Sequence, residues 1–502
     1  VWGYVPDRGE RIVAPTIPSE VITPNNPPTG WGILGDIYSR GWQRTDNTNN
    51  FLSFFATFAY SFKNRYVVNA NVRNDASNVF GQDINHRIDP TYSFGLSWRA
   101  SEEAFFQKHL KWITTLNFRG TFGIQGNALT RESPELILSQ QGVQPGYNRY
   151  FSTIGQIPNP YLSWERTRNW NFGVDLELFR MFYMNLEYYT RRSNAVITVD
   201  LPFEYGIDDM KRNGGIIYNR GIEYTLSFTP IQKRDFSLNI NLNASKNWNK
   251  GGETKIDRNT AMYLRGGSTQ ILKEGYPLSA FWSYSFAGLD GSNGKPMFNY
   301  VEVPDEEKSK SIDPTTYLVY SGETEPYFTG GLGFSFRYKS LSLNTSFSLL
   351  LGSKKRLPSP YSDFQGSGSM MPDPTKNVNR DLLNRWQKPG DEAYTNIPGL
   401  PTWPIEIGWT LPNTDSAESS IKMWEQSDAM VVSGSFLRCR NIGLSWQMKK
   451  EWCDKIHAKN LAINFNMDNI FVIASKRFNG FDPELENSIM PRSFSLGLNI
   501  GF

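Results

Sequence analysis

The chain has 502 residues, of which 39% are hydrophobic and 14% aromatic, and its mean hydropathy is −0.48. No segment approaches the run of about eighteen apolar residues that a transmembrane helix needs, which excludes a helical membrane protein. The net charge of +3 gives no reason to expect nucleic-acid binding. Cys439 and Cys453 are too few for a disulfide framework, so we expect two isolated thiols, with pairing as the alternative.

From Leu52 onward, apolar residues alternate with small polar ones in one segment after another. A period of two indicates a strand with one apolar and one polar face. The polar faces carry mainly Ser, Asn, Thr and Gly, with a few carboxylates, Asp175, Glu177, Glu187 and Glu223, which we expect to face a watery lumen or a plug. In chain order the predicted strands are 52–62, 66–73, 92–99, 112–122, 170–178, 182–188, 221–228, 236–244, 281–289, 297–303, 329–338, 341–350, 436–446, 461–467 and 492–502.

The last strand carries the pattern in its clearest form. Its apolar side chains share one face, while Ser493, Ser495, Gly497, Asn499 and Gly501 share the other. A chain that ends on so apolar a face suits a membrane barrel, whose outer surface is covered by lipid. We predict that this face contacts outer-membrane lipid and is read by the barrel-assembly machinery; its residues are Phe494, Leu496, Leu498, Ile500 and Phe502.

Short and long connections alternate along the chain. Short ones lie near residues 63–65, 179–181, 232–234, 290–295 and 339–340, and the longest of the others is 352–435. Outer-membrane barrels have short periplasmic turns and long extracellular loops. This pattern predicts an all-β transmembrane antiparallel barrel over residues 51–502, with about fifteen strands. Residues 1–50 are then expected to form an extracellular loop.

Several motifs of this sequence resemble those of the SusC/RagA family of TonB-dependent outer-membrane transporters. The most specific is NPYLSWERTRNWNFGVD at 159–175, which is similar to the family segment NPxLxWExTxxxNxGxD. Departures are Ala76 where the family usually has Gly, and Cys439 within the FLRLKNI-like segment 436–442. Other resembling segments lie at 66–81, 90–103, 118–127, 219–223 and 491–498.

The resemblance implies the barrel portion of a transporter with about 22 strands. In that family an amino-terminal plug contacts TonB, and a SusD-like surface lipoprotein caps the barrel, in some cases as a dimer of barrel–lipoprotein pairs. About seven strands and the plug would then lie outside this chain. The sequence begins at Val1 with no signal peptide, so we expect a mature or cleaved product. The expected location is the outer membrane of a Gram-negative bacterium similar to the Bacteroidetes.

No catalytic or metal-binding constellation is evident, because His86, His109 and His457 are scattered and no nucleotide or nucleophile motif is present. We therefore expect neither an enzyme nor a cofactor. Ligand contacts would come from aromatic rings in the long connections, since such rings stack on sugar faces. The alternative for each ring is packing within the loops or against a partner. The candidate substrate-binding residues are Tyr147, Tyr150, Trp403, Trp409 and Trp424.

Together these features predict active, TonB-dependent import of glycan fragments or peptides, without nucleic-acid binding. One alternative is a smaller passive, porin-like channel. Another is a structural or secretion component of an outer-membrane assembly.

Overall fold

The structure of the chain is a computed structural model. It describes residues 2–12, 42–77, 88–127, 136–144, 146–147, 149–159, 162–201, 203–207, 209–254, 261–267, 272–299, 313–361, 377–400, 409–410, 417–485 and 488–502. In this part of the chain, no helix is long and apolar enough to cross a bilayer.

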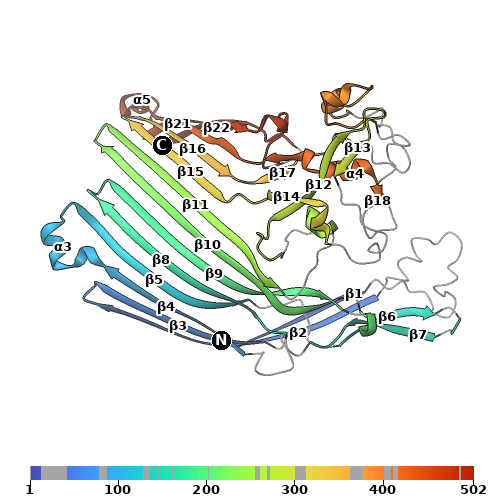
Figure 1. Ribbon diagram of the computed structural model, residues 1–502. Helices are drawn as coiled ribbons and strands as arrows, with labels where there is room; N and C mark the ends of the chain where they lie inside the picture. Colours follow the sequence, from blue (N-terminus) through green and yellow to red (C-terminus); the bar gives the residue numbers. More distant parts are fainter. Residues whose placement is uncertain are drawn as a thin grey trace.

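Fourteen antiparallel strands form one curved sheet, in which neighbours follow chain order and the strands skipped between β5 and β8, β11 and β15, and β16 and β21 belong to smaller sheets (Figure 1). The sheet is open in the described residues, because β1 and β23 are its two edges. The predicted all-β antiparallel fold is thus confirmed. The strands are β1 Trp2–Ile12, β2 Trp42–Phe62, β3 Tyr66–Ser77, β4 Ile88–Arg99, β5 Ile113–Asn127, β8 Glu165–Leu178, β9 Phe182–Asp200, β10 Asp209–Gln232, β11 Phe236–Thr254, β15 Phe328–Tyr338, β16 Leu341–Leu351, β21 Phe436–Gln447, β22 Asn460–Ala474 and β23 Ser493–Gly501.

Two of the strands predicted for the barrel wall, the large sheet, do not belong to it. The segments predicted at 281–289 and 297–303 correspond to β12 (Ala280–Leu289) and β13 (Pro296–Asn299), which form a separate three-stranded sheet with β14 (Leu318–Glu323). Trp282, Ser283 and Tyr284 are all buried, so both faces of β12 are covered. An alternating sequence does not distinguish a barrel strand from a strand inside a globular lobe.

Within residues 1–50, which we expected to form an extracellular loop, the structure has β1 and the beginning of β2. The two pair along residues 2–12 and 42–52 and extend the sheet. This part of the range is therefore strand rather than loop. The position of the pair relative to the membrane stays a prediction.

The two ends of the large sheet differ as the loop lengths predicted, except that the short turn predicted at 290–295 joins β12 and β13 of the separate sheet. Lys63 and Asn64, and likewise Phe179 and Arg180, have φ between 50° and 57° and lie in three-residue connections between paired strands. Left-handed residues at both positions are typical of type I′ turns, which match the twist of the flanking strands. These hairpins lie at the same end as α3 (Ala104–His109), α5 (Lys450–Lys455) and the C-terminus (Figure 1).

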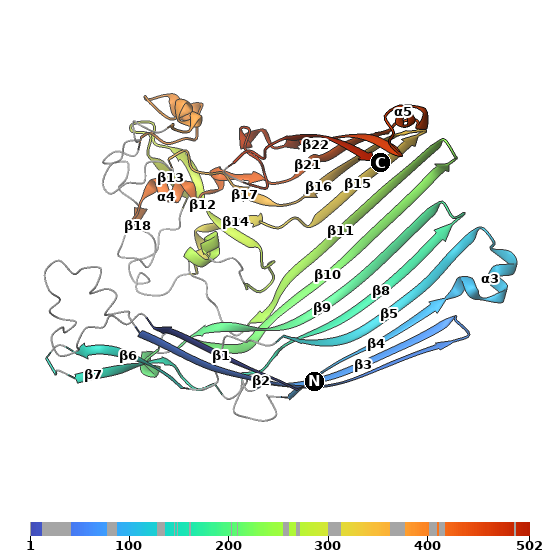
Figure 2. The ribbon, with the colours of Figure 1, turned by 180° about the vertical axis from the view of Figure 1, so that it is seen from behind.

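The opposite end carries a compact domain built from several long connections, which we call the outer lobe (Figure 2). Its core joins β12–β14 and α4 (Ser420–Glu425). The short pair β17 (Lys354–Arg356) and β20 (Val431–Ser433) lies beside this core, and Arg356 donates to the backbone carbonyl of Trp282. The open sheet presents its apolar side chains outward, so this lobe holds the main hydrophobic core. The buried apolar residues that pack together in this core are Leu264, Ala280, Trp282, Tyr284, Phe298, Tyr317, Leu318, Tyr361, Leu382, Ile421, Met423, Trp424 and Met430.

The remaining elements are short. A separate hairpin of β6 (Ile137–Gln144) and β7 (Arg149–Gln156) projects beyond the sheet near β1 and β2 (Figures 1 and 2). Further elements are the pair β18 (Trp409–Thr410) and β19 (Ala417–Glu418) and the helical turns Ala100–Glu102, Phe203–Tyr205, Tyr263–Gly267, Pro314–Thr316, Arg380–Asn384, Asp391–Ala393, Asp428–Met430 and Lys476–Phe478.

Candidate functional site

The polar face of the sheet carries a connected set of charges. Arg119 on β5 forms ion pairs with Asp175 on β8, at 3.1 Å, and with Glu187 on β9, at 2.9 Å. Asn185 donates a hydrogen bond to Asp175, and Asn171 donates one to Glu187. The two carboxylates therefore face the polar side, as predicted, and share one arginine as their ion-pair partner.

The strands further along the sheet continue this polar wall with neutral groups. Asn239 on β11 donates to the hydroxyl of Thr229 on β10 at 2.8 Å. Ser335 donates to Asn344 across β15 and β16, and Ser445 donates to Asn464 across β21 and β22, both at 2.7 Å. Amide and hydroxyl groups in such rows exchange easily with water or with the hydroxyl and amide groups of a ligand. The wall therefore suits contact with a hydrated polar molecule.

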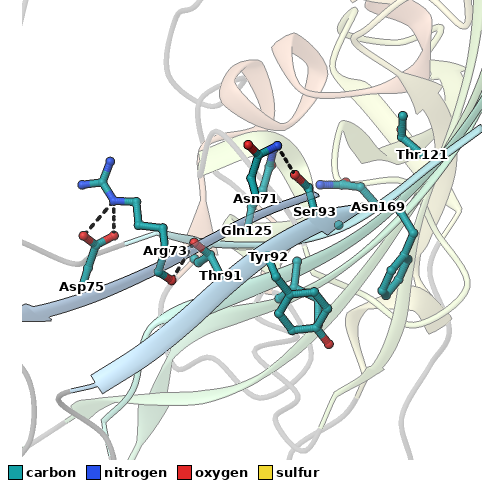
Figure 3. A pocket seen from close by; sticks show the side chains of 13 residues that line it. Asn71, Arg73, Asp75, Thr91, Tyr92, Ser93, Thr121, Gln125 and Asn169 are labelled. Carbon is teal, nitrogen blue, oxygen red and sulfur yellow. Dashed lines mark hydrogen bonds and ion pairs between the residues drawn. The ribbon is translucent and has the colours of Figure 1, made fainter. Parts of the chain in front are cut away.

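A pocket of about 520 Å³ lies on this wall, over β3, β4, β5 and β8. Asn71, Arg73, Ser93 and Gln125 line it, and Figure 3 shows Tyr92 directed to the other side of the sheet from Asn71 and Ser93. Arg73 donates from Nε to both carboxylate oxygens of the neighbouring Asp75 at 2.7 Å. The pocket therefore offers a guanidinium, a carboxylate and several amides in reach of one polar ligand.

A second pocket, of about 500 Å³, lies over β10, β11, β15, β16 and β21. Glu223, Asn243, Thr329 and Arg440 contribute its polar lining. The two pockets thus lie over different strands of the polar face. In the part of the chain that the structure describes, no three His, Cys, Asp or Glu side chains are grouped to hold a metal ion.

The five aromatic candidates for substrate binding are spread over different elements. Tyr147 lies between β6 and β7 and is 74% exposed. Tyr150 and Trp409 fall in β7 and β18, but their side chains are outside the described part, as is Trp403 altogether. Substrate contact by these four residues stays a prediction.

Trp424, the fifth candidate, is only 2% exposed and belongs to the core of the outer lobe. Its ring packs edge-on against Tyr361, and its Nε1 donates to the backbone carbonyl of Asn396 at 2.8 Å. Trp424 therefore packs within the lobe, which was the alternative to substrate contact for these rings. A direct contact with substrate would require the lobe to open.

Buried polar groups hold the outer lobe together. Burial, with the nearby charge of Arg265, lowers the pKa of Arg356 to about 10. The Arg356 guanidinium donates to the backbone carbonyl of Trp282 at 2.6 Å and stacks over Phe281. Tyr361 donates to the carbonyl of Pro398 at 2.6 Å, and burial raises the pKa of its hydroxyl.

Arg119 and the Arg73–Asp75 pair were not singled out from the sequence as functional residues. Arg119 occupies a polar-face position of its strand, opposite Gly173. The face of the strand on which Arg119 lies could be read from the alternation. Its ion-pair partners could not, because they lie 56 and 68 positions further along the chain. The two cysteines are free and buried, as expected.

The sequence of this chain is similar to those of known proteins. Residues 15–470 match the family described as "TonB dependent receptor-like, beta-barrel". The chain is similar to the TonB-dependent receptor SusC of Bacteroides thetaiotaomicron, with 26% identity over 90% of this chain and 44% of SusC. It is also similar to the TonB-dependent receptor P3 of Formosa agariphila, with 23% identity over 91% of this chain and 46% of that receptor.

Among solved structures, the fold is similar to one described as the RagAB peptide transporter. The TM-score is 0.70 at 22% sequence identity, and the match covers 92% of this chain and 48% of that chain. The chain thus spans about half the length of the relatives it matches. Because the family match extends over most of the described sheet, this chain belongs to the TonB-dependent receptor-like β-barrel family.

Proposed function

We propose that the protein containing this chain imports glycan fragments or peptides across the outer membrane, driven by TonB. The observation that carries the proposal is the two-sided sheet, apolar on one face and lined on the other by the Arg119–Asp175–Glu187 network. Such a wall provides a wet path through lipid for a large polar solute. The family and the relative named SusC support active transport.

A SusD-like lipoprotein is the partner in this proposal, because the chain is similar to SusC and to the RagAB peptide transporter. TonB would act through a plug that pairs with this wall. The outer lobe and the projecting β6–β7 hairpin supply folded surface at the end where a lid would sit. The chain itself performs no bond chemistry in this scheme.

The open sheet argues against a small passive channel made by this wall alone. Among the described residues, β23 pairs only with β22, and β1 pairs only with β2. Every bilayer-spanning sheet must satisfy its edge groups by closure. Additional strands are therefore part of the proposed transporter.

The test is gentle detergent extraction, followed by mass spectrometry of everything that travels with the protein. Recovery of a plug-containing segment and a lipoprotein supports the transporter. Uptake of labelled oligosaccharides and oligopeptides by cells with and without the gene then identifies the substrate class. A protein recovered alone that conducts ions in planar bilayers without TonB would overturn the proposal.

A further inference from the structure

The outward face of β8–β11 carries a band of positive charge near the end with the long connections. Five cations project from even-numbered positions, the same parity as the apolar residues Phe172 and Leu186 of the outer face, and all five are exposed. They are Arg168 on β8, Arg192 on β9, Arg220 on β10, and Lys246 and Lys250 on β11.

The register of the four strands brings these cations together. Arg168 lies directly opposite Arg192, Arg192 opposite Tyr218, and Tyr218 opposite Lys250. Arg220 is opposite Trp248, one outward position nearer the short turns. Residues directly opposite in an antiparallel pair have Cα atoms about 4.5–5.5 Å apart. Several positive charges therefore occupy a few neighbouring positions of one surface.

From β9 to β11, the cation on each successive strand lies one outward-facing position closer to the short turns: first Arg192, then Arg220, then Lys246. Barrel strands tilt by about 35–45° from the membrane normal, so a line of constant depth crosses them obliquely in this way. Trp170 and Tyr188 show the same step on β8 and β9. These three cations thus follow one level, on the long-connection side of the rings of Trp170 and Tyr188, and Arg168 and Lys250 lie within two outward positions of that level.

Aromatic rings lie beside three of the five cations and leave their charge in place. Lys246 Nζ lies 4.9 Å from the centre of the Trp248 ring and 5.6 Å from that of Tyr327. Arg220 and Arg192 lie 5.9 Å from the rings of Trp248 and Tyr218, respectively. No ion pair joins any of the five cations to a carboxylate within the described ranges. Like charges at opposing positions of a sheet destabilise it unless an anion lies between them.

The band is local. At the same end of β22 the outward residues are Phe471 and Ile473, which are exposed and uncharged. A general attraction to a charged membrane surface would not require such a concentration on four strands. The location on the lipid-facing side, just beyond the apolar belt, also excludes a solute passing through the lumen.

We propose that Arg168, Arg192, Arg220, Lys246 and Lys250 form a binding site for the phosphorylated headgroup of an outer-leaflet glycolipid. Guanidinium and ammonium groups would bind the phosphate oxygens, and Trp170, Trp248 and Tyr218 would lie against the boundary between headgroup and acyl chains. This inference rests on the proposed function only for the orientation of the sheet in the membrane, and it does not depend on which substrate is imported. Loss of lipid binding with normal uptake would therefore refute only this proposal.

The test uses the full-length protein in delipidated detergent micelles, titrated with diphosphoryl lipid A and observed by native mass spectrometry. The variant Arg168→Gln/Arg192→Gln/Arg220→Gln should lose affinity on the order of hundredfold, because each basic residue near a membrane surface contributes several-fold to binding. The matched control Lys63→Gln/Arg180→Gln/Arg234→Gln removes the same charge at the short-turn end and should bind like wild type. A second variant, Lys246→Gln/Lys250→Gln, should lose at least roughly tenfold. The heat-dependent gel shift of the folded barrel checks that each variant has assembled.

Binding should weaken as NaCl is raised, since exposed charges are screened. Phosphatidylcholine, which has no net charge, is the lipid control. Inorganic phosphate is the control for binding of a free anion. Equal lipid A affinity in both triple variants would overturn the site. Phosphatidylcholine bound as tightly as lipid A, inorganic phosphate that displaces lipid A at equal concentration, or a second protein chain on this face in place of lipid would each overturn the lipid assignment.

Discussion

Arg438 Nη2 donates to both carboxylate oxygens of Asp482, at 2.7 and 2.8 Å, and the side chains are 2% and 4% exposed. This ion pair ties the segment after β22 to the polar face of β21. Arg477 in the same segment donates to the carbonyl of Val431 at 2.8 Å, and Asn479 donates to Asp381 at 2.7 Å. The segment therefore joins the wall to the outer lobe.

Asp482→Asn should destabilise this junction by about 3 kcal/mol, because it leaves a buried guanidinium with one remaining carboxylate, Glu484. Hydrogen exchange of residues 476–485 and thermal unfolding would measure the effect. Glu484→Gln is the control: its side chain is 30% exposed, so a loss of about 1 kcal/mol or less is expected. Equal losses in the two variants would contradict the assigned burial.

The same pair predicts a loss of stability in acid. Burial tends to raise the pKa of Asp482, but hydrogen bonds from Arg438 and from the backbone N–H of Glu484 outweigh it and hold the pKa below its usual value. The stabilisation is complete above the unfolded-state pKa of about 4 and disappears as pH falls through the lower folded-state pKa. Exchange protection of residues 476–485 should fall in that range in wild type and change less in Asp482→Asn. Parallel pH profiles would refute this explanation.

Trp424→Ala should destabilise the outer lobe by about 3–5 kcal/mol, since it removes a large buried ring and its hydrogen bond to Asn396. Tyr147→Ala is expected to leave stability unchanged, because that ring is exposed. If Tyr147 contacts substrate, only its variant should weaken uptake while the melting temperature stays constant. A melting temperature lowered equally by both changes would contradict these placements.

Deletion of residues 352–435 should leave the wall assembled but unfold the rest of the outer lobe. Trp282 and Tyr284 on β12 pack in the core to which Tyr361, Met423 and Trp424 belong, so the deletion exposes them. Limited proteolysis should then cut within 280–299, and the folded-barrel gel shift should persist. Resistance of 280–299 to protease in the deletion variant would show that β12–β14 fold independently.

Leu498→Asp should reduce assembly, because Leu498 lies on the face of β23 that is apolar and pairs with Ile463. A charge on the lipid face costs up to about 2–4 kcal/mol at mid-membrane, and less for Asp. Asn499→Asp on the opposite face should be milder. Membrane levels of the two variants, compared by immunoblot, test the face assignment, and equal levels would refute it.

The alternating segments determined most of the wall, because the period of side chains along a strand is a local property. The short turns and the apolar face of β23 were likewise readable from a few residues each. The family resemblance of segments such as 159–175 added the identity of the fold, which the match over residues 15–470 confirms.

Contacts between distant segments were decided only by the tertiary structure. Period two assigned Phe281–Leu289 to the wall, whereas β12 is buried in the outer lobe, because alternation does not report what covers each face. Trp424 could not be recognised as a core residue until Tyr361 and Asn396 were placed beside it. Arg119 meets Asp175 and Glu187 through the register of three strands. Register and burial depend on all the strands together, so no single segment of sequence contains them.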